Sequence, residues 1–306
     1  MILYIGGVIF TKELEACYLC PRNCGVNRYY KTGVCGANDK MKIAHYSLHQ
    51  WEEPIISGSV GSGTIFFSYC NLKCIFCQNY KISTGGYGKE ISKEKFQELC
   101  LDLQKRGAHN INLVTPTHYV PQIVDAMQKI KGNELKIPVV YNTSSYENVS
   151  TIRMLDGVVD IYLADLKYFD DSLGCKYSHV KDYFYYASLA IKEMVKQVGN
   201  FVIRDDLMMR GVIVRILILP GHVDDAKKII NYLYTTYKDN IIISIMNQYT
   251  PLKHFDNYQN LNRKVDDDEY QEVIDYALDL GVKYAFIQEG ETQSESFIPN
   301  FDCSTI

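Results

Sequence analysis

The chain has 306 residues, of which 47% are hydrophobic and 22% are charged, and its formal net charge is −4. This composition is typical of a globular protein with a sizeable core, and the acidic balance gives a nucleic-acid partner no electrostatic support. The apolar first ten residues lack a basic flank, and no later apolar run is long enough to span a membrane. Ten cysteines in such a chain favour metal or redox chemistry over disulfides. We therefore expect a soluble, cytoplasmic protein that binds neither nucleic acid nor membrane.

Residues 1–60 are rich in cysteine and glycine and show little periodicity, which predicts a separate, irregular module. Four of its cysteines have the spacing of a closed metal site, and such a site can stabilise a module too small to fold by apolar burial alone. Structural zinc and an auxiliary iron–sulfur cluster both fit this pattern, and free thiols are the third alternative. The four residues are Cys17, Cys20, Cys24 and Cys35.

Two histidines in the same module, His45 and His49, are spaced i, i+4 as metal ligands on a helix can be. The surrounding segment "AHYSLHQWEEP" has no helical stripe, and the cysteine set is already complete. We therefore assign both histidines to structural roles.

From Gly63 onward, short apolar strands alternate with amphipathic helices. Ser92 is expected to cap the first helix and Gly107 to end it, with Cys100 packed on its apolar face. Units of roughly 30–40 residues predict a parallel sheet with right-handed crossovers, and about six units are fewer than a closed eight-fold barrel needs. Strands are expected over 64–69, 110–114, 137–142, 160–167, 212–220, 241–247 and 282–290, and further helices over 121–132, 185–199, 224–237 and 267–281.

Both an open barrel and a doubly wound sheet satisfy this alternation. In either case the active site lies at the carboxyl ends of the strands. We therefore divide the chain into a cysteine-rich metal-binding module over 1–60, an α/β unit over 61–290 and a tail over 291–306.

Three further cysteines, Cys70, Cys74 and Cys77, directly follow the first of these strands. Their spacing places three thiolates within reach of one polynuclear centre, whereas a [4Fe-4S] cluster ordinarily takes four. Three ligands leave one iron able to bind another molecule, as a catalytic zinc keeps one position open. Zinc ligation or buried thiols are the alternatives, but a zinc site requires a fourth cysteine or histidine that this loop lacks. We interpret the triplet as the ligands of an open cluster.

The stretch "CNLKCIFC", with Phe76 before its last cysteine, resembles the cluster motif of the radical S-adenosylmethionine (SAM) superfamily. In that family, one electron from the cluster cleaves SAM to methionine and a 5′-deoxyadenosyl radical, which abstracts a hydrogen atom. The stretches "NINLVTPTHY", "YNTSSYE", "KEMVKQVG" and "IMNQY" resemble the pyruvate formate-lyase-activating branch, which activates glycyl radical enzymes. This resemblance covers nearly the whole chain. It implies a partial (β/α)6 TIM-like barrel, a [4Fe-4S] cluster, SAM and a reductant of the flavodoxin or ferredoxin type.

The resemblance also implies contacts with SAM. Asp165 and Lys167 match the Asp-x-Lys of the activases, and the period of a strand places both on one face, although a solvated ion pair is the alternative. Arg215 stands in an apolar strand, where a guanidinium is costly unless an anion or hydrogen-bond acceptors receive it. The resemblance implies that it faces the carboxylate or ribose of SAM. Asn142 and Asn247, together with Phe76, complete this set.

One departure from the family pattern lies at the end of the second strand. Many members carry Gly-Gly-Glu there to bind the amino group of SAM, whereas this chain reads "TPTHY". Thr115 and Thr117 offer hydroxyl and carbonyl acceptors but no carboxylate. His118 could donate a proton, but a lone histidine at a loop mouth is assigned a structural role here.

The resemblance therefore predicts an oxidoreductase of the activating type that abstracts hydrogen from a glycine of a protein substrate. Peptide or RNA modification is the alternative within the superfamily. The acidic charge argues against RNA, and only Cys303 lies where many peptide maturases carry a cysteine-rich domain. A non-enzymatic zinc-binding adaptor that docks through residues 17–35 is the alternative outside it.

Overall fold

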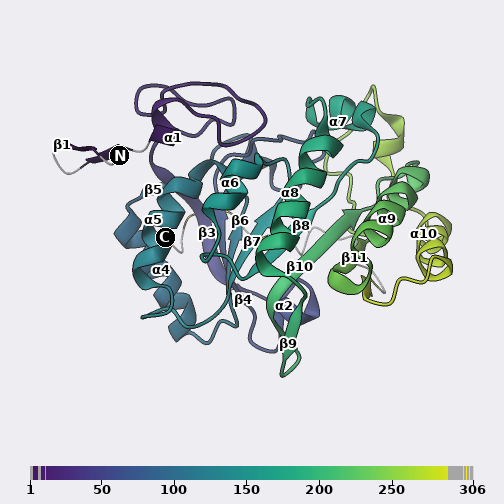
Figure 1. Cartoon of the computed structure of the whole chain (residues 1–306). Helices are drawn as coiled ribbons and strands as arrows, with labels where there is room; N and C mark the ends of the chain where they lie inside the picture. Colours follow the sequence, from purple (N-terminus) through teal and green to yellow (C-terminus); the bar gives the residue numbers. More distant parts are fainter. Residues whose placement is uncertain are drawn as a thin grey trace.

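The structure is a computed structural model that describes residues 3–5, 8–10 and 12–288, together with Pro299, Phe301, Cys303 and Ile306. Its main body is a curved, open sheet covered on one side by helices (Figure 1). The strand order is β12-β11-β10-β8-β7-β6-β4-β3-β5, and β9 pairs with β10 outside this path. The predicted tail over 291–306 lies almost wholly outside the described residues.

The parallel part of the sheet confirms the predicted α/β fold with a partial barrel. Strands β4, β6, β7, β8, β10, β11 and β12 pair with their neighbours in parallel, and the sheet does not close on itself. These strands are β4 Ser62–Phe67, β6 Ile111–Val114, β7 Val139–Thr143, β8 Ile161–Asp165, β10 Leu207–Leu217, β11 Ile242–Met246 and β12 Ala285–Ile287.

The helices follow the predicted crossovers. Ser92 caps α4, because its side-chain oxygen accepts a hydrogen bond from the backbone N–H of Lys95 at 3.1 Å, and Gly107 follows the helix with φ 89°. The main helices are α4 Lys93–Lys105, α5 Val120–Ile130, α6 Val149–Met154, α7 Asp171–Ser178, α8 Tyr183–Val198, α9 Val223–Tyr237 and α10 Asp267–Asp279. The short elements are β1 Leu3–Ile5, β2 Val8–Phe10, α1 Lys12–Glu15, α2 Pro54–Ser57, α3 Tyr80–Ser83 and β9 Val202–Arg204.

The sheet begins earlier in the chain than the sequence analysis predicted. The segment with the two histidines is strand β3 (Met41–His49), which pairs antiparallel with β4 and with β5 (Lys89–Ile91). Residues of the cysteine-rich module thus belong to the same sheet as the strands that follow. The boundary at residue 60 stays a prediction about domains.

The two faces of the parallel strands carry different side chains. Along β8, Tyr162 and Ala164 pack in the large core beneath the helices, whereas Ile161 and Leu163 belong to a smaller apolar cluster on the concave face. Ile56 of α2 packs into this smaller cluster and fills the amino end of the open barrel. The concave face is therefore closed by apolar residues at one end, and polar side chains follow at the carboxyl ends of its strands.

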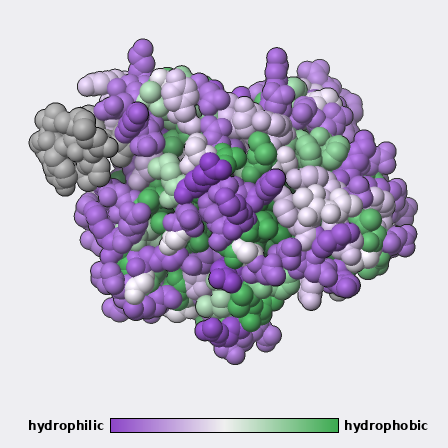
Figure 2. Space-filling view, viewed as in Figure 1, coloured by the Kyte–Doolittle hydropathy of each residue, from purple (hydrophilic) through white to green (hydrophobic). Residues whose placement is uncertain are grey.

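The surface is that of a globular molecule. Figure 2 shows hydrophilic residues over most of the face in view, with hydrophobic residues between them in smaller groups. Within the described ranges, no helix is long and apolar enough to cross a membrane.

Candidate active site

A cavity of about 490 Å³ opens at the carboxyl ends of the parallel strands. All three cysteines of the predicted cluster motif line it, together with the polar residues that end the neighbouring strands. This is the edge at which α/β barrels carry their active sites. Its lining includes Glu52, Glu53, Cys70, Cys74, Phe76, Cys77, Gln78, Thr115, Asn142, Ser144, Asp165, Lys167 and Arg215.

The loop after β4 directs the three thiols into this cavity. Tyr69 and Lys73, each directly before a cysteine, have φ values of 77° and 56°, a left-handed conformation that costs a non-glycine residue about 1–2 kcal/mol. The Tyr69 ring lies against Gly36 and Gly86, where an added Cβ would come within 2.7 Å and 2.3 Å of it. Tight packing of the ring therefore stabilises this loop conformation.

Each of the three thiols has a hydrogen-bond donor beside its sulfur. The Leu72 N–H points at Cys70 Sγ at 3.4 Å, Ser178 Oγ donates to Cys74 Sγ at 3.0 Å, and Ser83 Oγ donates to Cys77 Sγ at 3.4 Å. Donors of this kind favour the thiolates that an iron–sulfur cluster requires.

Burial acts against these donors. It raises the pKa of Cys70 to about 12 and also raises the pKa of Cys77, to which the neighbouring Cys74 contributes. These groups are therefore thiols when no metal is bound. Metal binding releases their protons, because the thiolate is the ligand.

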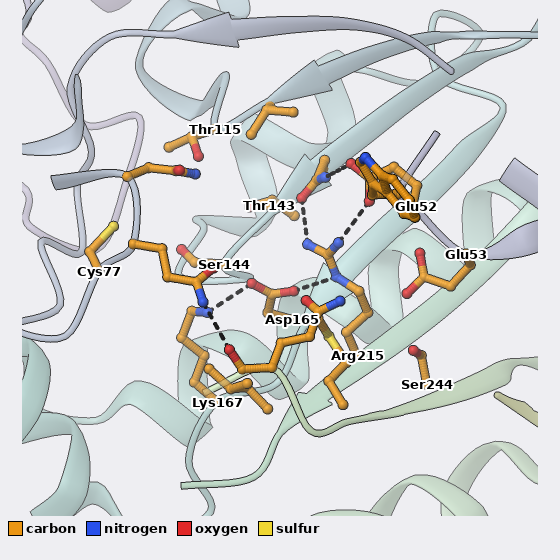
Figure 3. Close-up of a pocket in the computed structure, with 18 of the residues that line it drawn as sticks. Glu52, Glu53, Cys77, Thr115, Thr143, Ser144, Asp165, Lys167, Arg215 and Ser244 are labelled. Atoms are coloured by element: carbon orange, nitrogen blue, oxygen red, sulfur yellow. Dashed lines mark hydrogen bonds and ion pairs between the residues drawn. The ribbon is translucent and has the colours of Figure 1, made fainter. Parts of the chain in front are cut away.

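A network of charged side chains occupies the cavity opposite the cysteines (Figure 3). Arg215 Nε donates to Asp165 Oδ1 at 2.7 Å, and Lys167 Nζ donates to Asp165 Oδ2 at 2.8 Å. Although burial opposes ionisation, these two cations hold the pKa of Asp165 below its ordinary value. The other guanidinium nitrogens donate to Glu52 Oε2 at 3.0 Å and to Asn142 Oδ1 at 2.7 Å.

Two acidic residues of this network were not predicted from the sequence. Glu52 and Glu53 follow β3 and enter the cavity from the end closed by α2, where burial raises both pKa values in spite of Arg215. Glu52 Oε1 also accepts a hydrogen bond from Asn112 Nδ2 at 2.9 Å, whereas Glu53 Oε2 is buried and has no hydrogen-bond partner. The need of Arg215 for an anion was the one indication of them in the sequence.

The other predicted SAM contacts divide into two groups. Phe76, Thr115 and Asn142 line the cavity. The Thr117 side chain points away from it and donates to Glu147 Oε1 at 2.7 Å, and Asn247 is not among the lining residues. The predicted contacts of Thr117 and Asn247 with SAM thus have no support from their side-chain placement.

His118 is buried behind the cavity, where its Nε2 lies 2.8 Å from the Ser68 carbonyl oxygen. Burial and the nearby Arg28 lower its pKa to about 3, so the ring is neutral at ordinary pH. This placement fits the structural role assigned to His118.

The four cysteines of the amino-terminal module lie in a separate loop region. The sulfurs of Cys24 and Cys35 flank Gly33, where an added Cβ would be 3.6 Å and 3.2 Å from them. All ten cysteines of the chain are among the described residues and are free thiols. Within the same residues, no three histidine, cysteine, aspartate or glutamate side chains surround the position of a single metal ion.

Comparisons with known proteins bear on these features. Residues 64–233 match the model of the radical SAM superfamily. An uncharacterized protein of Methanocaldococcus jannaschii is 33% identical over 279 residues, which cover 88% of this chain and 75% of that protein.

Two solved structures of Streptococcus suis SuiB share the fold. The first has a TM-score of 0.50 and 16% identity and covers 73% of this chain and 47% of SuiB. The second, SuiB bound to its precursor peptide SuiA, has a TM-score of 0.50 and 15% identity and covers 72% of this chain and 46% of SuiB. The chain thus spans about half the length of SuiB, and at this identity the likeness concerns the fold alone.

Proposed function

The chain belongs to the radical SAM superfamily, and we propose that Cys70, Cys74 and Cys77 hold its [4Fe-4S] cluster. Members of this family are enzymes that use such a cluster together with SAM. One observation carries the assignment: three thiols of one loop line the same cavity as the Arg215–Asp165–Lys167 network. When bound, the cluster supplies the electron that cleaves SAM to the 5′-deoxyadenosyl radical, which removes a hydrogen atom from the substrate.

The residues present fit the cluster. Three ligands from one loop leave its fourth iron open to the cavity, whose volume lies in the range of small-molecule sites, about 300–1,000 Å³. The hydroxyl groups of Ser83 and Ser178 donate to two of the sulfurs and favour the thiolate state. Lys167 adds a positive charge that favours ionisation of Cys77.

The cavity also offers both signs of charge to the zwitterionic amino-acid part of SAM. We propose that Lys167 and Arg215 face its carboxylate and that the unpartnered carboxylate oxygen of Glu53 accepts its ammonium group. Glu53 would then take the place of the glutamate that the "TPTHY" segment lacks. Phe76, Thr115 and Asn142 line the same cavity, and Asn142 accepts a hydrogen bond from Arg215.

We further propose that the hydrogen donor is a glycine of a partner protein and that the reductant is of the flavodoxin or ferredoxin type. Support for this finer assignment comes from the four stretches that resemble the pyruvate formate-lyase-activating branch. Peptide modification is the second candidate, because SuiB, whose fold this chain shares, was solved with a bound precursor peptide. Both candidates have a polypeptide as substrate.

The first experiment tests the cluster assignment. Anaerobically reconstituted protein with dithionite and SAM should release 5′-deoxyadenosine, and Cys74→Ala should reduce this release to background. Cys175→Ala is the matched control, since Cys175 is an exposed thiol on α7, and it should retain release. Undiminished release from Cys74→Ala would contradict the assignment.

A second experiment tests the substrate. Proteins labelled with α-deuterated glycine should transfer deuterium into 5′-deoxyadenosine, and a glycyl radical should appear in the electron paramagnetic resonance spectrum. Deuterium transferred only from other labelled amino acids would exclude glycyl radical activation and favour peptide modification.

A further inference from the structure

Arg28, in the cysteine-rich loop, is fully buried among neutral groups. Its exposed fraction is 0%, and its Nη atoms donate to the carbonyl oxygens of His118 and Asn38. The guanidinium carbon lies 5.7 Å from the centre of the Tyr119 ring, and Nε has no hydrogen-bond partner. No carboxylate in the described part of the chain forms an ion pair with it.

An arginine keeps its charge in a protein, and a buried charge without a counter-ion is strongly unfavourable. Carbonyl oxygens and an aromatic face satisfy donors but carry no net negative charge. His118 is neutral and cannot balance Arg28 either. The charge must therefore be balanced by a group that becomes negative in the functional protein.

The groups beside Arg28 that can become negative are thiols. Cys17 and Arg28 are held in the same part of the loop, because the Cys17 N–H donates to the Val26 carbonyl oxygen at 3.0 Å and the Arg28 N–H donates to the Leu14 carbonyl oxygen at 2.7 Å. Tyr119, whose ring faces Arg28, packs in the same buried cluster as Cys35, and its hydroxyl has no hydrogen-bond partner. Arg28 Nε and the Tyr119 hydroxyl are thus buried donors without an acceptor next to these cysteines.

A backbone N–H group of the loop is placed to favour one of these thiolates. The donor is the residue two positions after the cysteine, since the Ala37 N–H points at Cys35 Sγ at 3.5 Å. Leu72 and Cys70 repeat this arrangement in the loop that we assign to the family cluster.

We propose that Cys17, Cys20, Cys24 and Cys35 bind a second metal centre, whose four thiolates supply the negative charge that balances Arg28. Zn²⁺ with four thiolates and a [4Fe-4S]²⁺ cluster with four thiolates both carry a net charge of about −2, so the charge argument applies to either. The four thiol protons pass to water as the centre forms. The sulfurs of Cys24 and Cys35 both lie within 4 Å of the point where a Cβ at position 33 would stand, and Gly33 places no side chain there.

This centre would lie against the loop of the catalytic cysteines. Arg22 donates to the carbonyl oxygens of Asn71 at 2.9 Å and Leu72 at 3.3 Å, and Lys73 Nζ donates to the Val34 carbonyl oxygen at 2.8 Å. The inference rests on charge and packing in the module and does not depend on the reaction proposed for the cavity.

Metal content of the full chain tests the site. In the variant with Cys70, Cys74 and Cys77 all replaced by alanine, one arm supplies zinc alone and the other supplies iron and sulfide anaerobically. We expect about one zinc, or about four irons and four sulfides, to remain per chain. The arm that loads identifies the centre, and loading in neither arm overturns the proposal.

A second variant tests the same site in case the first variant misfolds. Cys17→Ala with Cys35→Ala, with the catalytic triplet intact, should lose that same zinc or iron while keeping the iron of the family cluster. Unchanged total metal in this variant would overturn the proposal.

The role of Arg28 has its own measurement. Arg28→Met should release the metal to a chelator about 10–100-fold faster than the wild type, whereas Arg28→Lys should stay near it, because Lys retains the charge. In the metal-free chain, Arg28→Met should be more stable than the wild type and should unfold at a higher urea concentration. Equal release rates, or a loss of stability by Arg28→Met in both states, would overturn the charge assignment.

Discussion

Arg215 in the barrel has 13% of its side chain exposed and Arg28 in the amino-terminal module is fully buried, and their surroundings differ. Arg215 donates to the carboxylates of Asp165 and Glu52 and to the amide oxygen of Asn142. The Nη atoms of Arg28 donate only to backbone carbonyl oxygens. The barrel thus contains the counter-charge of Arg215, whereas the described residues of the module supply none to Arg28.

This difference distinguishes two ways of keeping a charge inside a protein. A pair within the chain is balanced before any ligand binds and can position that ligand afterwards. A cation without a pair makes folding depend on a bound anion, as in small metal-binding domains. Substitutions of charged groups in the two regions test this difference.

The largest effect is expected at the paired arginine. Arg215→Met leaves Asp165 and Glu52 as buried carboxylates with fewer cationic partners, which should lower the free energy of unfolding by about 3–5 kcal/mol. Urea denaturation of the metal-free chain measures this change in the free energy of unfolding. A loss below about 1 kcal/mol would show that the pairing in the barrel contributes little and would remove the contrast with Arg28.

Glu147 extends the comparison to a buried anion without a cation. Its Oε1 accepts hydrogen bonds from the hydroxyls of Thr117, Tyr141 and Thr143, and burial raises its pKa from 4.5 to about 7. Because the folded pKa is the higher one, its contribution to stability is full below pH 4.5 and is lost as the pH rises to about 7. The shift corresponds to about 3 kcal/mol.

Glu147→Gln should therefore remove most of this pH dependence. Urea unfolding at pH 5 and pH 8 measures it, and the free energy of unfolding of the wild type should fall by about 2.5 kcal/mol more than that of the variant between the two, because part of the loss precedes pH 5. Glu134→Gln, at an exposed position, is the control. Parallel curves for the wild type and Glu147→Gln would contradict the burial argument.

The smallest effect is expected at Arg22, which has neutral partners but is only partly buried. It donates to four carbonyl oxygens, those of Asn71, Leu72, Ser178 and His179. Arg22→Met should cost about 2 kcal/mol from the lost charge-assisted hydrogen bonds, without any dependence on metal. Arg153→Met, whose side chain is 64% exposed, should cost about 0.5 kcal/mol or less. If Arg22→Met lowered the stability only of the metal-loaded chain, Arg22 would also depend on the metal. Full burial would then no longer distinguish Arg28 from Arg22.

The local patterns of the sequence predicted much of the fold. Alternating apolar strands and amphipathic helices gave the open parallel sheet, and the cap at Ser92 and the stop at Gly107 lie where expected. Strand β3 was missed, because an antiparallel strand of mixed burial carries little periodic information and is defined by its partners β4 and β5. Its pairing is a long-range property.

The candidate site likewise contains residues that local patterns could predict and residues that depend on long-range contacts. The cysteine triplet could be found from its spacing, and the Asp165–Lys167 pair from its resemblance to a family motif, since both lie at the ends of predicted strands. Glu52 could not, because only the course of the chain beneath the barrel brings it to Arg215. The contact of Thr117 with SAM stays a prediction, and the helical turn at Thr117–Tyr119 directs its hydroxyl to Glu147.

The position of β3 has a practical consequence for anyone who wishes to shorten the protein. A chain that starts at residue 61 would lack β3. Strand β4 would then lose its antiparallel partner, and Arg215 would lose its hydrogen bond to Glu52. It would also remove Gly36 from the ring of Tyr69, the residue directly before Cys70. The segment 64–233, which matches the family model, thus lacks contacts on which its own strands and loops depend. A loss of activity in a truncated chain would therefore reflect lost packing and would not identify catalytic residues.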